Sequence, residues 1–491
     1  MASMTAKKQL LFSIITAIGA LLLIEFTLRL TGTGDPLYDN YEPYAGYEKS
    51  PPFYIENPVN KAEIINNPLY KDLHQITFRR TKPENTCRIA LTGGSNVNYL
   101  AEDDLANWIK GDKILPEKLH LEIINAGMPG YGSRRVKRIL VEILQYDPDM
   151  VFIYCGHNEF LDLLVSQRVA RPQGSFEYFR KNVLYKLNSY IALKNLYRKL
   201  RKPSIKMNRE EIKDTYLKNI SDIEKNESIT FKELSEKVYD QFEQNLIQMV
   251  RLAKRNNSYV ILSTTPSNDF VSPVYSFYTA GLSTTEIAKI KLLEKQGDEI
   301  LGERLYFLND SGWFNSQLFI HKTKEKTFPY ILRVFHDRFK LSPFASELTE
   351  NIKPYNIQGT EKTIWLNALD KYEQALKIND KIAMIQYKAG LIHYLTGNKD
   401  KALYHFHQAN LYDGYPYRST ERINNIIRDV ARREKVDYLL DFEEFIRQNA
   451  PDSIIGWESL YDHCHLQLEN KILLLKKIEE RIYKHCKNLC T

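Results

Sequence analysis

From residue 88 onward, short apolar runs alternate with longer stretches in which apolar side chains recur at helical spacing. Apolar runs of this length are typical of strands that are buried on both faces in a parallel sheet. Strands are predicted at residues 89–91, 123–126, 150–155, 259–263 and 436–441, with helices at 136–145 and 231–254 and a last helix at 471–487. This rhythm predicts an α/β protein built on a doubly wound parallel sheet.

Small or polar residues follow each of the first three predicted strands. They are Gly-Gly-Ser at 93–95, a glycine-rich loop at 127–133 and Gly-His-Asn-Glu at 156–159. Open α/β sheets bind their ligands at the carboxyl ends of the strands, so we expect these segments to meet at one edge. A Gly-Gly-Ser turn is also a common way to leave a strand, and the simple turn is the alternative interpretation of that segment taken alone.

Together these segments resemble the SGNH/GDSL hydrolases, which implies a flavodoxin-like three-layer α/β/α fold. By this resemblance Ser95 is the nucleophile, and Gly130 and the side-chain amide of Asn158 form the oxyanion hole. The Asp-x-x-His block of the family is matched by Asp462 and His465. The resemblance covers roughly residues 85–160, 230–270 and 420–480.

Two positions depart from the pattern of the family. Gly94 stands where Gly-Asp-Ser is usual, a variant that resembles membrane-anchored and polysaccharide-acylating branches of the superfamily. Glu159 follows Asn158 where Asp is frequent. Neither departure removes a catalytic group, but the first widens the range of substrates that the resemblance implies.

The residue types also support acyl transfer on chemical grounds. A serine hydroxyl is a weak nucleophile until an imidazole takes its proton, and a carboxylate holds the imidazole in the right tautomer. Asp462 and His465 are three residues apart and can meet within one turn; His463 is a rival base. Water as the acceptor predicts an esterase or deacylase, and a sugar hydroxyl predicts an O-acyltransferase. No cofactor and no metal are implied.

The loop after the strand at 259–263 borders the substrate in the family that the chain resembles. Ser267 and Asn268 are therefore weak candidates for substrate binding. The expected substrate is an O-acyl ester, in particular an O-acetyl ester, of a glycan or lipid, or another small ester.

An apolar stretch near the N-terminus predicts a membrane anchor. From Leu10 to Leu30 the only charges are Glu25 and Arg29. Twenty-one helical residues reach about 31 Å, enough to cross a hydrocarbon core. Lysines precede the stretch and acidic residues follow it, which predicts a cytoplasmic N-terminus and an extracytoplasmic catalytic domain, periplasmic in a bacterium. A cleaved signal peptide is the alternative to this single-pass anchor.

Residues 160–226 are rich in Lys and Arg with interleaved Tyr and Leu. They predict a solvated helical insertion or, alternatively, a basic amphipathic flap that lies on anionic lipid. The net charge of the whole chain is only +7, which gives no reason to expect nucleic acid as a partner.

An internal repeat is visible between residues 361 and 412. Ala368, Tyr372 and Ala375 recur 34 positions later as alanine, phenylalanine and alanine, with Gly390 ahead of the second copy. Thirty-four is the tetratricopeptide period, so a helical insertion of this kind is predicted, with a protein as its possible partner. So short an array needs to dock on the rest of the protein. An inactive, membrane-tethered scaffold that works through this repeat is the alternative to an enzyme.

Five cysteines at irregular spacing give no metal-binding pattern and argue against a disulfide framework. Cys486 and Cys490 are near enough to pair in an oxidising compartment, but unpaired tail cysteines are the favoured interpretation.

The predicted organisation follows the order of the chain. It consists of a cytoplasmic stub and anchor (1–30), an irregular leader (31–85), the hydrolase core with its basic insertion (86–355), the repeat-like insertion (356–415) and the last part of the core (416–491).

Overall fold

The computed structural model describes the chain in several stretches. They are residues 6–35, 52–100, 119–164, 179, 183–200, 231–302 and 358–486, apart from 69, 71–72, 74, 275, 279–281, 415 and 457. The predicted core between 303 and 355 and much of the basic insertion lie outside these residues. The described chain forms two compact units, one of residues 1–52 with 164–223 and one of residues 53–163 with 224–491.

The larger unit is built on a five-stranded parallel sheet. Its order in space is β5-β4-β6-β7-β8, the 2-1-3-4-5 order of flavodoxin-like doubly wound sheets. The α/β class and the parallel sheet predicted from the apolar runs are therefore confirmed. The strands are β4 (Thr86–Gly93), β5 (His120–Gly127), β6 (Met150–Tyr154), β7 (Tyr259–Ser263) and β8 (Tyr438–Leu440).

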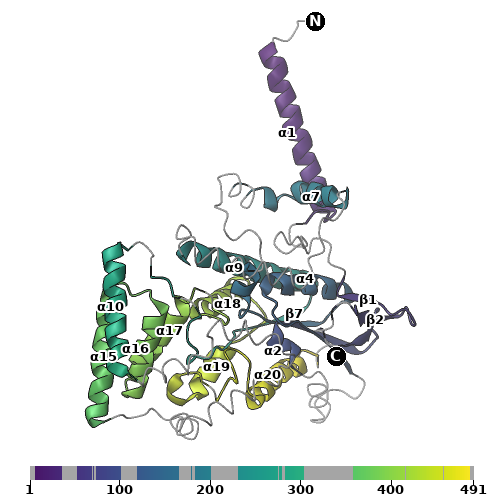
Figure 1. The fold of residues 1–491 in the computed structure, drawn as a ribbon. Helices are drawn as coiled ribbons and strands as arrows, with labels where there is room; N and C mark the ends of the chain where they lie inside the picture. Colours follow the sequence, from purple (N-terminus) through teal and green to yellow (C-terminus); the bar gives the residue numbers. More distant parts are fainter. Residues whose placement is uncertain are drawn as a thin grey trace, which may run out of the picture. The chain divides into compact units, whose positions relative to one another are not determined.

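Helices cover both faces of this sheet (Figure 1). One face carries α4 (Ser133–Ile143), α9 (Phe231–Arg255) and α18 (Glu421–Arg433). The other carries α2 (Ser95–Asn98), α19 (Phe442–Asn449) and α20 (Leu468–Cys486). Short helical segments join these elements: η3 (Leu144–Tyr146), α5 (Glu159–Leu164) and η5 (Pro451–Ser453).

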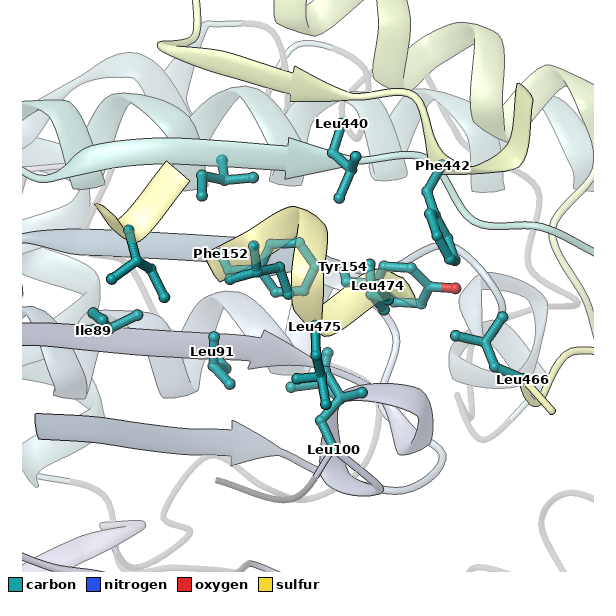
Figure 2. Close-up of a cluster of buried hydrophobic side chains, with 14 of the residues drawn as sticks. Ile89, Leu91, Leu100, Phe152, Tyr154, Leu440, Phe442, Leu466, Leu474 and Leu475 are labelled. Atoms are coloured by element: carbon teal, nitrogen blue, oxygen red, sulfur yellow. The ribbon is translucent and has the colours of Figure 1, made fainter. Parts of the chain in front are cut away.

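Alternate residues of the central strands form the core beneath α20, as expected from the two-residue period of a strand. Leu91, Phe152 and Tyr154 point from the sheet toward Leu474 and Leu475 of α20 (Figure 2). Because both faces of β4 and β6 are covered, all of β6 and residues 89–91 of β4 are apolar.

A disulfide joins Cys87 at the start of β4 to Cys486 at the end of α20. The expectation of unpaired tail cysteines is therefore wrong for Cys486, and Cys490 lies outside the described residues. The two cysteines are 399 positions apart, so no local spacing in the sequence predicts their pairing. The bond ties the central strand to the last helix of the unit.

A small antiparallel sheet occupies part of the segment expected to be irregular. It consists of β1 (Tyr54–Glu56), β2 (Glu63–Asn66) and β3 (Thr77–Arg79). The strands are only three or four residues long, too short for their alternation to stand out in the sequence. The expectation of irregular structure is wrong for this part of 31–85; residues 36–51 lie outside the description.

Four helices form a helical unit beside the sheet: α10 (Thr284–Leu301), α15 (Gly359–Ile378), α16 (Ala383–Leu395) and α17 (Lys399–Leu411) (Figure 1). They pack as α10 on α15, α15 on α16 and α16 on α17. A Cβ built on Gly297 of α10 would lie 2.5 Å from the ring of Tyr372 on α15. One on Gly390 of α16 would lie 2.8 Å from the ring of Phe406 on α17.

The same glycine-to-aromatic contact thus occurs twice, which makes α10–α15 and α16–α17 equivalent helix pairs. α10 lies before the predicted boundary at 356 yet packs on α15; the domain bounds themselves stay predictions. The 34-residue offset marks the second helix of each pair; the tetratricopeptide assignment stays a prediction.

The helical unit packs on the loop that follows β7. The Tyr387 hydroxyl donates to the carbonyl of Phe270, and the backbone N–H of Met384 donates to the hydroxyl of Ser276. The Phe270 ring contacts Tyr394 and Phe406 edge-on. The repeat therefore docks on the α/β part, as its small size required.

The smaller unit contains α1 (Ala6–Leu30), η4 (Leu184–Lys186) and α7 (Asn188–Leu200). Within α1, Phe12–Leu30 has a mean hydropathy of 1.8 and no buried residues, so it is long and apolar enough to cross a membrane. This agrees with membrane anchoring, and the direction of crossing stays a prediction.

Candidate functional site

Ser95 begins α2 immediately after β4, at the carboxyl edge of the sheet. The first strand of the sheet, β4, lies between the second and the third, β5 and β6, so the chain turns in opposite directions on its two sides. Such a switch point is where doubly wound sheets bind ligands. Ser95 therefore lies where a doubly wound sheet would place a residue that contacts a ligand.

Ser95, His465 and Asp462 form one chain of hydrogen bonds. Nε2 of His465 lies 2.7 Å from Oγ of Ser95. Nδ1 of the same ring lies 2.6 Å from Oδ2 of Asp462. With its proton on Nδ1 facing the carboxylate, the imidazole presents Nε2 as an acceptor for the serine hydroxyl. The structure thus brings the three predicted residues together in the predicted order.

The environment of Asp462 favours its ionised form. Burial acts to raise the pKa of this carboxyl, but the imidazoles of His463 and His465 and a hydrogen bond from the Cys464 backbone N–H outweigh burial and hold the pKa well below its usual range. The carboxylate stays charged at neutral pH and can stabilise an imidazolium.

Two asparagines hold the loop that carries His465. The side chain of Asn96 donates to the carbonyl of Cys464 and accepts from the N–H of Leu466, so it brackets His465. From the other side, the side chain of Asn268 donates to the carbonyl of Asp462. Asn96 was missed because its partners lie about 370 positions away; its only signal was its place directly after Ser95.

Asn268, predicted as a substrate-binding residue, thus contacts the Asp462 loop directly. Its backbone N–H also donates to the carbonyl of His463. Ser267 is buried and donates its hydroxyl to the carbonyl of Ser419. The structure places both side chains in hydrogen bonds within the protein, and a direct contact with substrate stays a prediction.

Asn158 and the loop of Gly130 lie against the residue before Ser95. A Cβ on Gly94 would be 2.9 Å from Nδ2 of Asn158 and 3.3 Å from the carbonyl oxygen of Tyr131. A larger residue at 94 would therefore require the Asn158 side chain or the Tyr131 carbonyl to shift. Nδ2 of Asn158 donates one hydrogen to Tyr131, 3.2 Å away, and has a second to offer.

Two backbone donors complete the site. Within the described part of the chain, the N–H groups of Ser95 and Gly130 have no acceptor. Backbone N–H groups are nearly always paired, so unpaired ones beside a nucleophile are available to a ligand oxygen. With the amide of Asn158, they are the candidate donors for a ligand oxygen at this edge of the sheet.

Glu159, which stands where aspartate was expected after Asn158, has a structural role. Its carboxylate accepts from the backbone N–H and the hydroxyl of Ser133, at 2.9 and 2.6 Å, at the first turn of α4. The carboxylate thus caps α4 and links the loop of Gly130 to the turn of Asn158. Glu159 thus fixes the spacing between the loop that carries the Gly130 N–H and the turn that carries the Asn158 amide.

Two aromatic rings and a lysine surround the imidazole. The ring of Tyr461 stacks on His465 with centroids 5.5 Å apart, and that of Tyr99 lies 5.4 Å away. Nζ of Lys471 is 5.5 Å from the centre of each tyrosine ring. These side chains restrict the tilt of the imidazole and place one cation close to the site.

The ligand atoms of Asp462, His463 and Cys464 lie within 4.8 Å of one another, a grouping that resembles a metal site. Both oxygens of Asp462 already accept hydrogen bonds from the loop and from His465. This grouping fits the orientation of His465 better than it fits a metal.

No profile of a known protein family, no characterised protein and no solved structure matches this chain.

Proposed function

We propose that this protein is a membrane-anchored serine hydrolase of the SGNH/GDSL type that acts on carboxylic esters. The observation that carries the proposal is the unbroken chain from Ser95 through His465 to Asp462, placed at the switch point of the sheet. The candidate donors beside Ser95 add the second requirement of acyl transfer, a site for the oxyanion.

In this mechanism His465 takes the proton of Ser95 as the hydroxyl attacks the ester carbonyl. The charge that develops on the carbonyl oxygen is stabilised by the N–H groups of Ser95 and Gly130 and by the Asn158 amide. Asp462 stabilises the imidazolium, which then gives its proton to the leaving alcohol. Water, activated by His465, attacks the acyl-enzyme and releases the acid. A sugar hydroxyl in place of water would make the same site an O-acyltransferase.

The Cys87–Cys486 disulfide supports an extracytoplasmic location for this unit. Disulfides form in oxidising compartments and are rare in the cytosol. An anchor that leaves its N-terminus in the cytoplasm would place the disulfide, and the site, on the oxidising side. The substrates proposed there are O-acyl esters of an envelope glycan or lipid.

The test is hydrolysis of p-nitrophenyl acetate by the full chain in detergent, compared with Ser95→Ala and His465→Ala. We expect kcat to fall by about 10³- to 10⁶-fold in both variants, because nucleophile and base act as one unit. The melting temperature of Ser95→Ala should change little, since this side chain is partly exposed. His465 is buried, so the fold of His465→Ala is checked by circular dichroism before its activity is compared.

A fluorophosphonate probe should label the parent chain and leave Ser95→Ala unlabelled. His463→Gln is the comparison variant, since this imidazole also lies beside Asp462 and is the rival base. Absence of both turnover and labelling in the folded parent would rule the esterase out. If His463→Gln lost activity and His465→Ala kept it, the general base would be His463 and the proposed role of His465 would be wrong.

A further inference from the structure

Two charged residues interrupt the otherwise apolar C-terminal half of α1. Glu25 and Arg29 lie one turn apart, and Nε of Arg29 donates to the Glu25 carboxylate at 2.7 Å. Charged side chains in or near a hydrocarbon region are costly unless they are paired. One guanidinium leaves most of the acceptor capacity of the carboxylate unused.

The start of α7 supplies the remaining partners of Glu25. The backbone N–H groups of Asn188 and Ser189 and the Ser189 hydroxyl donate to this carboxylate at 3.0, 2.9 and 2.7 Å. A carboxylate placed on the first N–H groups of a helix stabilises that helix end. Glu25 therefore acts as the cap of a helix that is about 160 residues away in the sequence.

The contact is reciprocal. The side-chain amide of Asn188 donates to the carbonyls of Leu28 and Thr33, at 3.4 and 3.1 Å, where α1 ends. Arg29 donates to the carbonyl of Lys186 at 3.2 Å. Each helix thus satisfies terminal backbone groups of the other, which fixes the start of α7 at the C-terminal end of α1 (Figure 1).

The two sides of α7 differ in what they contact. Asn188 and Ala192 lie on the side that faces the end of α1, where both would contact a Cβ on Gly34. On the other side Leu193, Leu196 and Leu200 are 66, 53 and 78% exposed, and Tyr197 between them is 59% exposed. The spacing of i, i+3, i+4 and i+7 places these four on one face, which forms an apolar stripe with a tyrosine in it.

We propose that α7 is an interfacial helix, held by Glu25 at the membrane surface where α1 emerges, with its leucine face inserted into the lipid. The occupant of the face is lipid because α7 starts at the end of an apolar helix that is long enough to cross a membrane and has no buried residue in its spanning stretch. Leucines with an aromatic residue are the composition with which helices lie in the headgroup boundary. The inference does not depend on the proposed chemistry.

A nitroxide on Leu196→Cys in the full chain tests this directly. The protein is placed in phosphatidylcholine–phosphatidylglycerol proteoliposomes, with Cys490→Ser to remove the tail thiol; Cys155 and Cys464 are buried. We expect the label to collide more often with oxygen, which concentrates in lipid, than with a water-soluble nickel chelate. Leu292→Cys is the matched control, since this leucine of α10 is equally exposed at 55%.

A label at 196 as accessible to the chelate as the one at 292 would overturn the proposal. Glu25→Leu then tests the docking, because it removes the acceptor and leaves α1 more apolar. We expect the 196 label to move toward water in this variant, while a label at Leu22 stays in lipid and reports that the span is intact. An unchanged 196 label would show that Glu25 does not hold α7.

Discussion

The edge of the sheet around Ser95 and the helical unit of α10 and α15–α17 are built by different forces. At the edge, hydrogen bonds fix the loop of His465, as those of Asn96 and Asn268 do. In the helical unit, small residues let aromatic rings approach a neighbouring helix, as Gly390 does for Phe406. Directional bonds position groups, whereas close packing supplies stability.

This difference predicts that the two regions respond to mutation in opposite ways. Removing the half-buried side chain of Asn158 at the edge should slow the reaction and leave the melting temperature nearly unchanged. A methyl group added inside the helical unit should lower the melting temperature and leave the chemistry of the folded fraction unchanged.

Asn158→Ala is expected to give the larger effect. Removing one oxyanion donor typically lowers kcat by about 10²- to 10³-fold, and KM should change little because the donor acts on charge that develops in the transition state. Steady-state kinetics with p-nitrophenyl acetate measures both. Asn449→Ala at the end of α19 is the matched control. A higher KM at constant kcat would mean that Asn158 binds the ground state and is no oxyanion donor.

Gly297→Ala and Gly390→Ala test the other side of the comparison. Alanine favours a helix by about 1 kcal/mol over glycine, but each new Cβ would lie within 3 Å of an aromatic ring. Overpacking of this kind costs about 1–3 kcal/mol, so both variants should melt several degrees lower with kcat unchanged. Phe406→Leu combined with Gly390→Ala should restore part of the loss. A variant more stable than the parent would refute the close approach.

Local patterns in the sequence were enough to predict the sheet, and the resemblance to the SGNH/GDSL hydrolases pointed to Ser95, Asp462 and His465. Apolar runs located β4, β6 and β7, and the polar residues that follow strands located Ser95 and Asn158. Asp462 and His465 were predictable because one turn of chain brings them together. Each strand, each loop after a strand and the Asp462–His465 pair lies within a segment of about ten residues.

Features that depend on distant partners were not predictable in this way. The disulfide of Cys87 and the clamp by Asn96 join positions hundreds of residues apart. The place of α10 in the helical unit was hidden because the long segment 303–357 separates Gly297 from Tyr372 and breaks the 34-residue period. Such contacts are set by the topology of the sheet and leave no periodic trace.

His157 lies where the two regions meet. The dependence of the melting temperature on pH tests this junction. Its Nδ1 accepts the backbone N–H of Ser419, at 3.2 Å, from the segment that leads out of the helical unit. Burial, with the nearby imidazoles of His463 and His465, lowers the pKa of His157 to about 3. The native imidazole is therefore neutral throughout the range in which an unfolded histidine, with a pKa of about 6.5, takes up a proton.

Below pH 6.5 the unfolded chain gains a proton that the native chain lacks, so native stability falls as the pH decreases from about 6.5 toward 3, by up to about 1.4 kcal/mol per pH unit for this residue. His157→Asn keeps an acceptor for Ser419 and removes the titration. Its melting temperature should fall less steeply than that of the parent between pH 7.5 and 5, while the exposed His120→Asn should follow the parent. Parallel curves for parent and His157→Asn would mean that acid acts elsewhere, and the junction of the two regions would then be insensitive to pH.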